Sequence, residues 1–432
     1  MRTTTHLVRR GACAAALAIL AAGAASVPAL AAGTTPTTLA PSDGVGGDLF
    51  GESTATSTNG AVTVVGSPEH NSSGAVYVFT GTGSAATQTA ELTPGNPQAD
   101  EQFGQTVAIS GDGQTLVAAA PGAAGASGSD QGAADVFTDQ GGTWTQIATL
   151  SVPGTAELGE SLAISTDAST IVLGSPTSNN DNGEAFVFTK SGSTYVQTQE
   201  LTPSTSSTSS AKVLARTVPA ARKKPTPTPT PAVPAFLGDN AAISANGSTI
   251  AFGEPNAGVT VVFTKAAGAS TWTQTAQLNG GGDSVAVSGN GTIVAAGQAG
   301  INNLNGAVFV FKESGSTFTE ASEVLPPANT TRAAFAAGSN VGMSADGSVI
   351  AFGAPTATAG TAFESGEVFV ATESSTGTWA LTGTDNEPNP VSDDDLGGGD
   401  QSVAVAGNGS AIVAGARAAN GQTGQAFVFP VS

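Results

Sequence analysis

The sequence predicts an all-β fold, a seven-bladed β-propeller with four antiparallel strands in each blade. Three observations lead to this prediction. Glycine accounts for 57 of 432 residues and charged residues for only 11%, so amphipathic helices would lack a charged solvent face. A unit of about 50 residues recurs seven times, starting near residues 50, 103, 158, 237, 282, 338 and 399. Each unit contains four short strand-like runs that are separated by turn residues.

The four runs follow the same order in each unit. The first run, such as residues 107–110, alternates apolar and small residues and ends at an Asn-Gly or Asp-Gly pair, which accepts the positive φ of a tight hairpin. These pairs are Asn59-Gly60, Asp112-Gly113, Asn246-Gly247, Asn290-Gly291, Asp346-Gly347 and Asn408-Gly409, with Asp167-Ala168 as the exception. The second run closes the hairpin, and the third is rich in valine and phenylalanine. The fourth begins at an aromatic residue in five units: Trp144, Tyr195, Trp272, Phe318 and Trp379.

The two ends of the chain predict how the ring closes. The seventh unit stops at Ser432, directly after its third run. Residues 34–40 precede the first unit and match the fourth runs of other units. Because an open ring would leave a sheet edge unpaired, we predict that residues 34–40 complete the last blade. The ring then has 28 strands.

The first 32 residues have the order of a secretory signal peptide. Three arginines precede an apolar run at 12–25, and the small-residue segment Ala29-Leu30-Ala31 follows it. The only cysteine, Cys13, lies in this segment, so the mature chain has no disulfide. We expect a secreted protein, extracellular or periplasmic, that is exported by the Sec or the twin-arginine route. No later apolar run is long enough to insert into a membrane once the signal is removed.

The mature chain, residues 33–432, is predicted to be one acidic domain with one basic insertion. Residues 204–235 combine Ser/Thr runs, a Pro-Thr alternation and five basic residues, so we expect a disordered insertion between the third and fourth blades. The formal net charge of the whole chain is −20, and without the signal and this insertion the remainder carries −28. Nucleic acid is therefore excluded as a partner, because phosphate binding requires clustered cations.

The repeats resemble the FG-GAP family, which builds the seven-bladed propeller of integrin α subunits and of many secreted bacterial proteins. The resemblance is carried by Phe103-Gly104 with Ala120-Pro121, by Leu158-Gly159 with Gly174-Ser175-Pro176, and by Phe352-Gly353-Ala354-Pro355. It implies an adhesion or interaction module. FG-GAP blades often bind calcium in a DxDxDG loop between their first two strands. The corresponding turns here, such as SGDGQT, are shorter and have one acid at most, so no calcium site carries over.

A ring of polar residues is the first candidate site. Directly after the motif glycine, the seven units place Glu52, Gln105, Glu160, Asp239, Asp283, Ser339 and Gln401. Since the first strand of a propeller blade is innermost, these side chains should surround one mouth of the central channel. Four carboxylates there would concentrate cations or accept hydrogen bonds from sugar hydroxyls. The alternative is that they hydrate the mouth and cap strand ends.

Two acidic loops are candidate metal sites. One contains Asp181 and Glu184, and the other is the run Asp393-Asp394-Asp395. Both offer the oxygen ligands that calcium takes, and calcium is the one cofactor that we consider. The alternative is that both are solvated loops. The mature chain has a single histidine, His70, which we expect in an exposed loop, so most nucleophile-base pairs and nearly all zinc sites lack their parts.

The sequence favours binding over catalysis. We expect a monomeric, non-enzymatic module that binds an extracellular protein or a cell-surface partner through the loops of one face. A lectin-like propeller is the alternative, in which the recurring aromatic residues stack on sugars instead of packing the blades. A secreted glycan hydrolase that uses two carboxylates is a more distant alternative.

Overall fold

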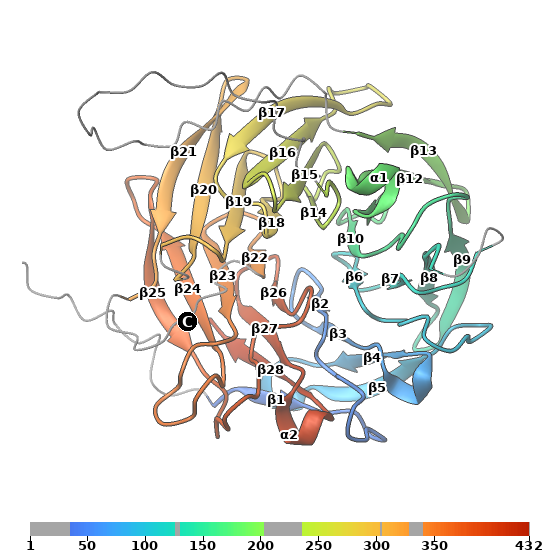
Figure 1. The fold of residues 1–432 in the computed structure, drawn as a ribbon, viewed down its shortest axis with the longest axis vertical. Coiled ribbons are helices and arrows are strands. Elements are labelled where there is room, and N and C mark those ends of the chain that lie inside the picture. The colour runs from blue at the N-terminus through green and yellow to red at the C-terminus, as the bar shows by residue number, and fades with distance from the viewer. Residues whose placement is uncertain (1–34, 126–129, 203–235, 303–304, 328–339, 432) are drawn as a thin grey trace, which may run out of the picture.

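Seven four-stranded antiparallel sheets surround a central axis (Figure 1). This computed structural model describes residues 35–125, 130–202, 236–302, 305–327 and 340–431. The arrangement confirms the predicted seven-bladed propeller. The proposed signal segment, the insertion at 204–235 and Ser339 lie outside the described residues.

Each blade runs outward from the channel. The innermost strands are β2 (Thr54–Thr56), β6 (Val107–Ile109), β10 (Ser161–Ile164), β14 (Asn240–Ile243), β18 (Ser284–Val287), β22 (Val341–Met343) and β26 (Val403–Val405). The second strands are β3 (Val62–Ser67), β7 (Thr115–Ala120), β11 (Thr170–Ser175), β15 (Thr249–Glu254), β19 (Ile293–Gln298), β23 (Val349–Ala354) and β27 (Ala411–Ala416). The third strands are β4 (Ala75–Thr80), β8 (Ala133–Asp139), β12 (Glu184–Ser191), β16 (Val259–Thr264), β20 (Ala307–Ser314), β24 (Glu367–Glu373) and β28 (Gln425–Pro430). The outer strands are β5 (Thr87–Leu92), β9 (Trp144–Leu150), β13 (Thr194–Leu201), β17 (Thr273–Asn279), β21 (Thr317–Val324), β25 (Trp379–Asp385) and β1 (Thr37–Leu39).

The helices of the described residues are single turns in loops between strands. They are η1 (His70–Ser72), η2 (Gly83–Ala85), α1 (Ser178–Asp181) and α2 (Ala419–Gln422). In the part of the chain that the structure describes, no helix has the length and apolar character to cross a bilayer.

Strand β1 closes the ring as predicted. It pairs antiparallel with β28, with Thr37 opposite Val428 and Leu39 opposite Ala426. Figure 1 shows β1, in blue, beside β28, in red, in this last blade. Leu39 is 1% exposed and belongs to a core cluster that also contains Tyr77 of the first blade. The N-terminal strand therefore joins the last blade to the first.

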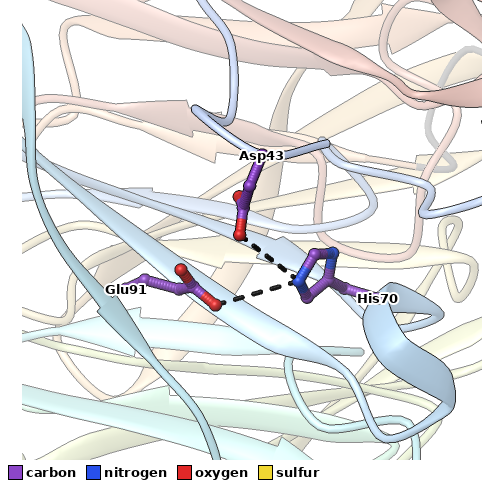
Figure 2. A group of neighbouring side chains, drawn as sticks. All are labelled: Asp43, His70 and Glu91. Atoms are coloured by element: carbon purple, nitrogen blue, oxygen red, sulfur yellow. Dashed lines mark ion pairs between the residues drawn. The ribbon is translucent and has the colours of Figure 1, made fainter. Parts of the chain in front are cut away.

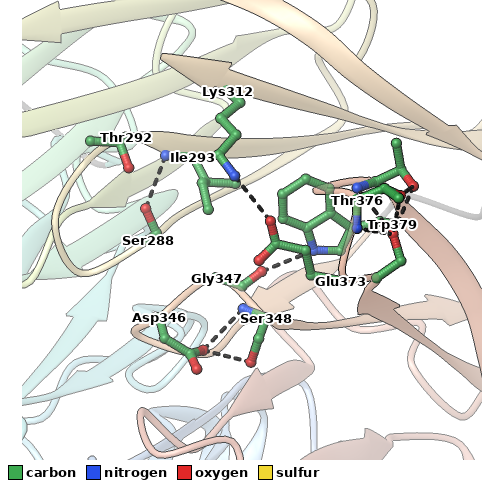
Figure 3. Close-up of polar contacts among 12 residues, drawn as sticks. Ser288, Thr292, Ile293, Lys312, Asp346, Gly347, Ser348, Glu373, Thr376 and Trp379 are labelled. Atoms are coloured by element: carbon green, nitrogen blue, oxygen red, sulfur yellow. Dashed lines mark hydrogen bonds and ion pairs between the residues drawn. The ribbon is translucent and has the colours of Figure 1, made fainter. Parts of the chain in front are cut away.

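The Asn-Gly and Asp-Gly pairs form hairpin turns between the first and second strands, as predicted. In the sixth blade, Asp346 Oδ1 accepts a hydrogen bond from Ser348 N at 2.9 Å (Figure 3). It accepts another from Ser344 Oγ at 2.6 Å. Gly347 then has a φ of 77°, which favours glycine. The same serine-to-Asx hydrogen bond joins Ser57 to Asn59, Ser110 to Asp112, Ser165 to Asp167, Ser244 to Asn246 and Ser288 to Asn290.

Aromatic residues at the start of the outer strands donate hydrogen bonds to the carbonyl groups of these turns. Trp379 Nε1 donates a hydrogen bond to Gly347 O at 2.9 Å (Figure 3). Trp272 Nε1 donates to the turn carbonyl of Gly247 at 3.1 Å, and the Tyr195 hydroxyl donates to a turn carbonyl at 2.6 Å. All three side chains are buried. The contacts of these three residues support blade packing over the alternative that they stack on sugars.

The glycine of each Phe-Gly or Leu-Gly motif contacts the preceding blade. Ser161 Oγ donates a hydrogen bond to Gly238 O at 2.7 Å. A Cβ on Gly174, in the second strand, would collide with the same carbonyl oxygen. The blades approach this closely because neither glycine has a side chain.

Candidate functional site

The innermost strands of all seven blades line a central channel. Its middle is a cavity of about 240 Å³ whose lining combines apolar side chains, such as Leu162 and Val285, with polar ones, such as Asn240 and Gln401. At one end, beyond the hairpin turns, the lining contains uncharged residues such as Thr58, Gly111 and Thr166.

Seven backbone hydrogen bonds connect neighbouring blades around that uncharged end. They run from Thr58 N to Gly111 O, Gly111 N to Thr166 O, Thr166 N to Ala245 O, Asn246 N to Gly289 O, Gly289 N to Ala345 O, Ala345 N to Gly407 O and Asn408 N to Thr58 O. These bonds form a continuous circle and hold the blades in register. The polar backbone groups of this mouth are thus used to hold the ring together.

Acidic side chains gather at the opposite mouth. A cavity of about 280 Å³ there is lined by Glu160, Asp239, Asp283 and Asp400. All four are half-buried. Three of them, Glu160, Asp239 and Asp283, are members of the predicted ring.

Glu52, the predicted ring member of the first blade, is neutralised by an ion pair. It is 2% exposed, and Arg417 Nη1 lies 2.9 Å from its Oε1 and 3.1 Å from its Oε2. Arg417 Nε also donates to Asp395 Oδ2 at 2.8 Å. This ion pair joins the first blade to the last, so Glu52 acts in ring closure.

The amide members of the predicted ring make internal hydrogen bonds. Gln105 Nε2 donates to Asp400 Oδ2. Gln401 Nε2 donates to Leu162 O at 3.2 Å, and Gln401 lies in the channel instead of at the acidic cavity. The structure therefore brings Glu160, Asp239 and Asp283 together at this cavity. Glu52 lies beside it, where it accepts a hydrogen bond from Asp400 N at 3.2 Å and pairs with Arg417, and Gln401 lies in the channel.

Asp400 reaches the mouth because the last blade carries an insertion. The motif of this blade is Leu396-Gly397, since Leu396 forms a bridge with Gly366 as Phe103 does with Gly74. It lies three residues before the expected repeat start near 399. Residues 398–400 are additional relative to the other blades, and they project Asp400 over the cavity. The run of three glycines at 397–399 is the sequence signal that marks this departure.

Crowding of carboxylates raises their pKa values. Burial, followed by the charges of Asp400, Glu157, Asp239 and Glu52, raises the pKa of Glu160 to about 8. Burial and the charges of Asp400 and Asp283 raise the pKa of Asp239 to about 6. A cation in this cavity would relieve the repulsion that contributes to both shifts.

The two predicted metal loops do not assemble a metal-binding group. Asp181 is exposed at the end of α1, and Glu184 begins β12. Asp393 is exposed, Asp394 accepts a hydrogen bond from Val391 N at 2.8 Å, and Asp395 pairs with Arg417. Among the described residues, the one group of three potential ligand side chains that comes together is Asp43, His70 and Glu91.

The prediction that His70 is exposed is wrong. Its side chain is 3% exposed, and its Nδ1 lies 2.9 Å from Asp48 Oδ2. The segment between β1 and β2 supplies Asp48. Sequence reasoning missed this contact because the two residues are 22 positions apart and belong to different turns.

A family model described as the FG-GAP repeat matches residues 34–79 and 86–137. These matched segments carry FG-GAP repeats. They comprise β1, the first blade and part of the second, and the remaining blades have the same four-strand order.

Two solved structures are similar to this FG-GAP propeller. One is a putative 6-phosphogluconolactonase from Bacteroides uniformis, at 14% identity and a TM-score of 0.51, covering 85% of this chain and 89% of that one. The other is the Cps50 (Swd1) β-propeller domain from Myceliophteria thermophila, at 10% identity and a TM-score of 0.55, covering 92% of this chain and 100% of that one. At these identities the similarity shows the fold alone. No curated protein shows a detectable sequence match.

Proposed function

We propose that this FG-GAP propeller is an exported, non-enzymatic binding module whose acidic mouth receives a basic side chain of an extracellular protein. The observation that supports this is the cavity lined by Glu160, Asp239, Asp283 and Asp400. Within the described residues, none of these four carboxylates forms an ion pair, whereas Arg417 pairs with Glu52 and Asp395. The mouth therefore has uncompensated negative charge.

The volume of the cavity and its negative charge favour one inserted cationic side chain. At about 280 Å³ it is near the lower limit of pockets that hold drug-sized ligands, so a lysine or arginine side chain matches it better than a large ligand. An anion would be repelled by the same carboxylates. This argues against a phosphorylated substrate of the kind that the name of the Bacteroides protein describes.

Two further features support an extracellular protein as the partner. The signal-like order of residues 1–32 favours export, and the net charge of −20 would steer a basic partner toward the propeller. A lectin role loses its main support, since Trp272 and Trp379 are buried against hairpin turns.

Titration with a fluorescent lysine- and arginine-rich peptide tests this proposal. The wild type is compared with the triple variant Glu160→Gln, Asp239→Asn, Asp283→Asn at low and at physiological salt. We expect the variant to bind roughly tenfold more weakly or worse, and we expect salt to weaken wild-type binding.

A matched control removes three carboxylates elsewhere. Glu200, Glu320 and Glu323 are exposed on outer strands, and their replacement by glutamine removes the same number of carboxyl groups. Equal loss of binding in the control and in the mouth variant would refute the proposed site, because it would show that overall charge alone attracts the peptide. No binding of the peptide to the wild type would also refute it.

The raised pKa of Glu160 supports a second candidate function, carboxylate-dependent glycan hydrolysis. A glutamate with a pKa of about 8 stays protonated at neutral pH, as a general acid requires, while another carboxylate of the same cavity would act as base or nucleophile. Release of reducing sugar from a polysaccharide by the wild type, and its loss in Glu160→Gln, would favour this function over the binding module.

A further inference from the structure

A second cluster of ionisable side chains lies at the seam where the ring closes. Asp43 belongs to the segment between β1 and β2, and β1 is part of the last blade. His70 and Glu91 belong to the first blade, in η1 and β5. Figure 2 shows the carboxylates of Asp43 and Glu91, which come from two different segments, pointing toward the imidazole of His70.

The distances within this cluster fit a transition-metal ion. His70 Nε2 lies 3.7 Å from Asp43 Oδ2 and 3.8 Å from Glu91 Oε1, and all three ligand atoms lie within 4.8 Å of one another. In tetrahedral zinc sites, bonds of about 2.0–2.1 Å place ligand atoms roughly 3.4 Å apart. Small side-chain movements would bring these atoms to that spacing.

Buried neighbours orient two of the three ligands. Asp48, which is 3% exposed, accepts a hydrogen bond from His70 Nδ1 at 2.9 Å and another from Val45 N at 2.7 Å. A proton on Nδ1 leaves the lone pair on Nε2, which faces Asp43 and Glu91. The Tyr77 hydroxyl donates to Asp43 Oδ1 at 2.9 Å, and the other oxygen of Asp43 faces the histidine. In metal sites, the histidine nitrogen that does not bind the metal usually donates a hydrogen bond to a carboxylate or a carbonyl, as His70 Nδ1 does to Asp48.

The charge of the cluster also suits a cation. Two carboxylates, those of Asp43 and Glu91, face the same nitrogen of His70. Asp43 and Glu91 are 46% and 31% exposed, so an ion has access from solvent. Calcium does not fit, because it takes six to eight oxygen ligands and this group offers one nitrogen and two carboxylates.

We propose that Asp43, His70 and Glu91 bind a zinc-type divalent transition-metal ion, with water in the fourth position, and that the bound ion ties the ring-closing segment to the first blade. This site is separate from the acidic mouth. Asn71 Nδ2 donates to His70 Nε2 at 2.8 Å, and this exposed side chain swings away when the ion enters.

Calorimetric titration with zinc tests the site on purified protein that a chelator has freed of metal. We expect one zinc ion per chain, a melting temperature that rises by several degrees and falls again with chelator, and slower proteolysis between β1 and β2. Asp43→Asn and Glu91→Gln alter partly exposed side chains and should remain folded by circular dichroism. Each substitution should weaken zinc binding by at least about tenfold.

Four further variants separate this site from general metal attraction. Asp48→Asn, a positioning variant, should weaken zinc binding by about 10–100-fold, whereas Asn71→Ala should strengthen it. Glu69→Gln removes an exposed carboxylate next to His70 in sequence and should change nothing. Glu160→Gln should bind zinc like the wild type, so failure of the mouth proposal leaves this one intact. Absence of zinc binding, or equal affinity in the wild type, Asp43→Asn and Glu91→Gln, would overturn the proposal.

Discussion

Replacing Glu160 with glutamine is expected to change how the stability of the protein depends on pH. Burial and the charges of Asp400, Glu157 and Asp239 raise the pKa of Glu160 from 4.5 to about 8. The folded protein therefore keeps a proton in a pH range where the unfolded chain has released it. The contribution of Glu160 to the free energy of unfolding is therefore fully present below pH 4.5 and is lost as the pH rises toward 8.

The structure sets the size of this effect. Each pKa unit corresponds to about 1.4 kcal/mol, so a shift from 4.5 to about 8 corresponds to at most ~5 kcal/mol. Glu160 is only half-buried, so water and salt screen the repulsion and we expect ~2 kcal/mol. Glutamine keeps the shape of the protonated side chain and has no charge at any pH. Glu160→Gln should thus match the wild type at pH 5 and exceed its free energy of unfolding by that amount at pH 8.

Urea denaturation at pH 5, 6, 7 and 8, followed by tryptophan fluorescence, measures the difference. Glu320→Gln is the control, since Glu320 lies exposed on the outer strand β21. Stability curves of the wild type and Glu160→Gln that stay parallel across this pH range would show that burial and the neighbouring charges do not raise the pKa of Glu160. The reasoning about the acidic mouth would then be wrong.

Three substitutions test the packing of the blades. Trp379→Phe removes the hydrogen bond to Gly347 O and should lower the free energy of unfolding by about 1–2 kcal/mol in thermal denaturation. Gly174→Ala places a methyl group against the next blade's motif glycine and should cost about 1–3 kcal/mol, whereas Ala119→Gly, at the same strand position of the second blade, should cost only about 0.5–1 kcal/mol. Leu39→Ala empties a fully buried position of β1 and should cost about 2–5 kcal/mol, with faster proteolysis of the N-terminal strand.

Each of these predictions has a definite contrary result. Unchanged stability of Trp379→Phe would mean that water replaces the lost donor at the turn. A Gly174→Ala variant as stable as Ala119→Gly would mean that neighbouring blades can move apart without cost. Unchanged proteolysis in Leu39→Ala would mean that β1 does not hold the ring closed.

The acidic mouth was predictable where the repeat is regular. Glu160, Asp239 and Asp283 directly follow motif glycines, so their position in the unit indicated that they share one mouth. Asp400 breaks this rule because three extra residues shift it relative to the motif at Leu396. Glu52 obeys the rule but is neutralised by Arg417, a partner 365 positions away.

The sequence by itself determined the number of blades, the strand order and the closure by β1. These features follow from glycines, turn pairs and apolar alternation, which are local signals, and seven copies reinforce one another. Only the tertiary structure decided how closely these ionisable groups approach one another and which others join them. The mouth carboxylates come from four different blades, and the Asp43, His70 and Glu91 cluster joins the closing segment to the first blade. Their distances depend on how the blades pack around the axis, and no local pattern of residues encodes that separation.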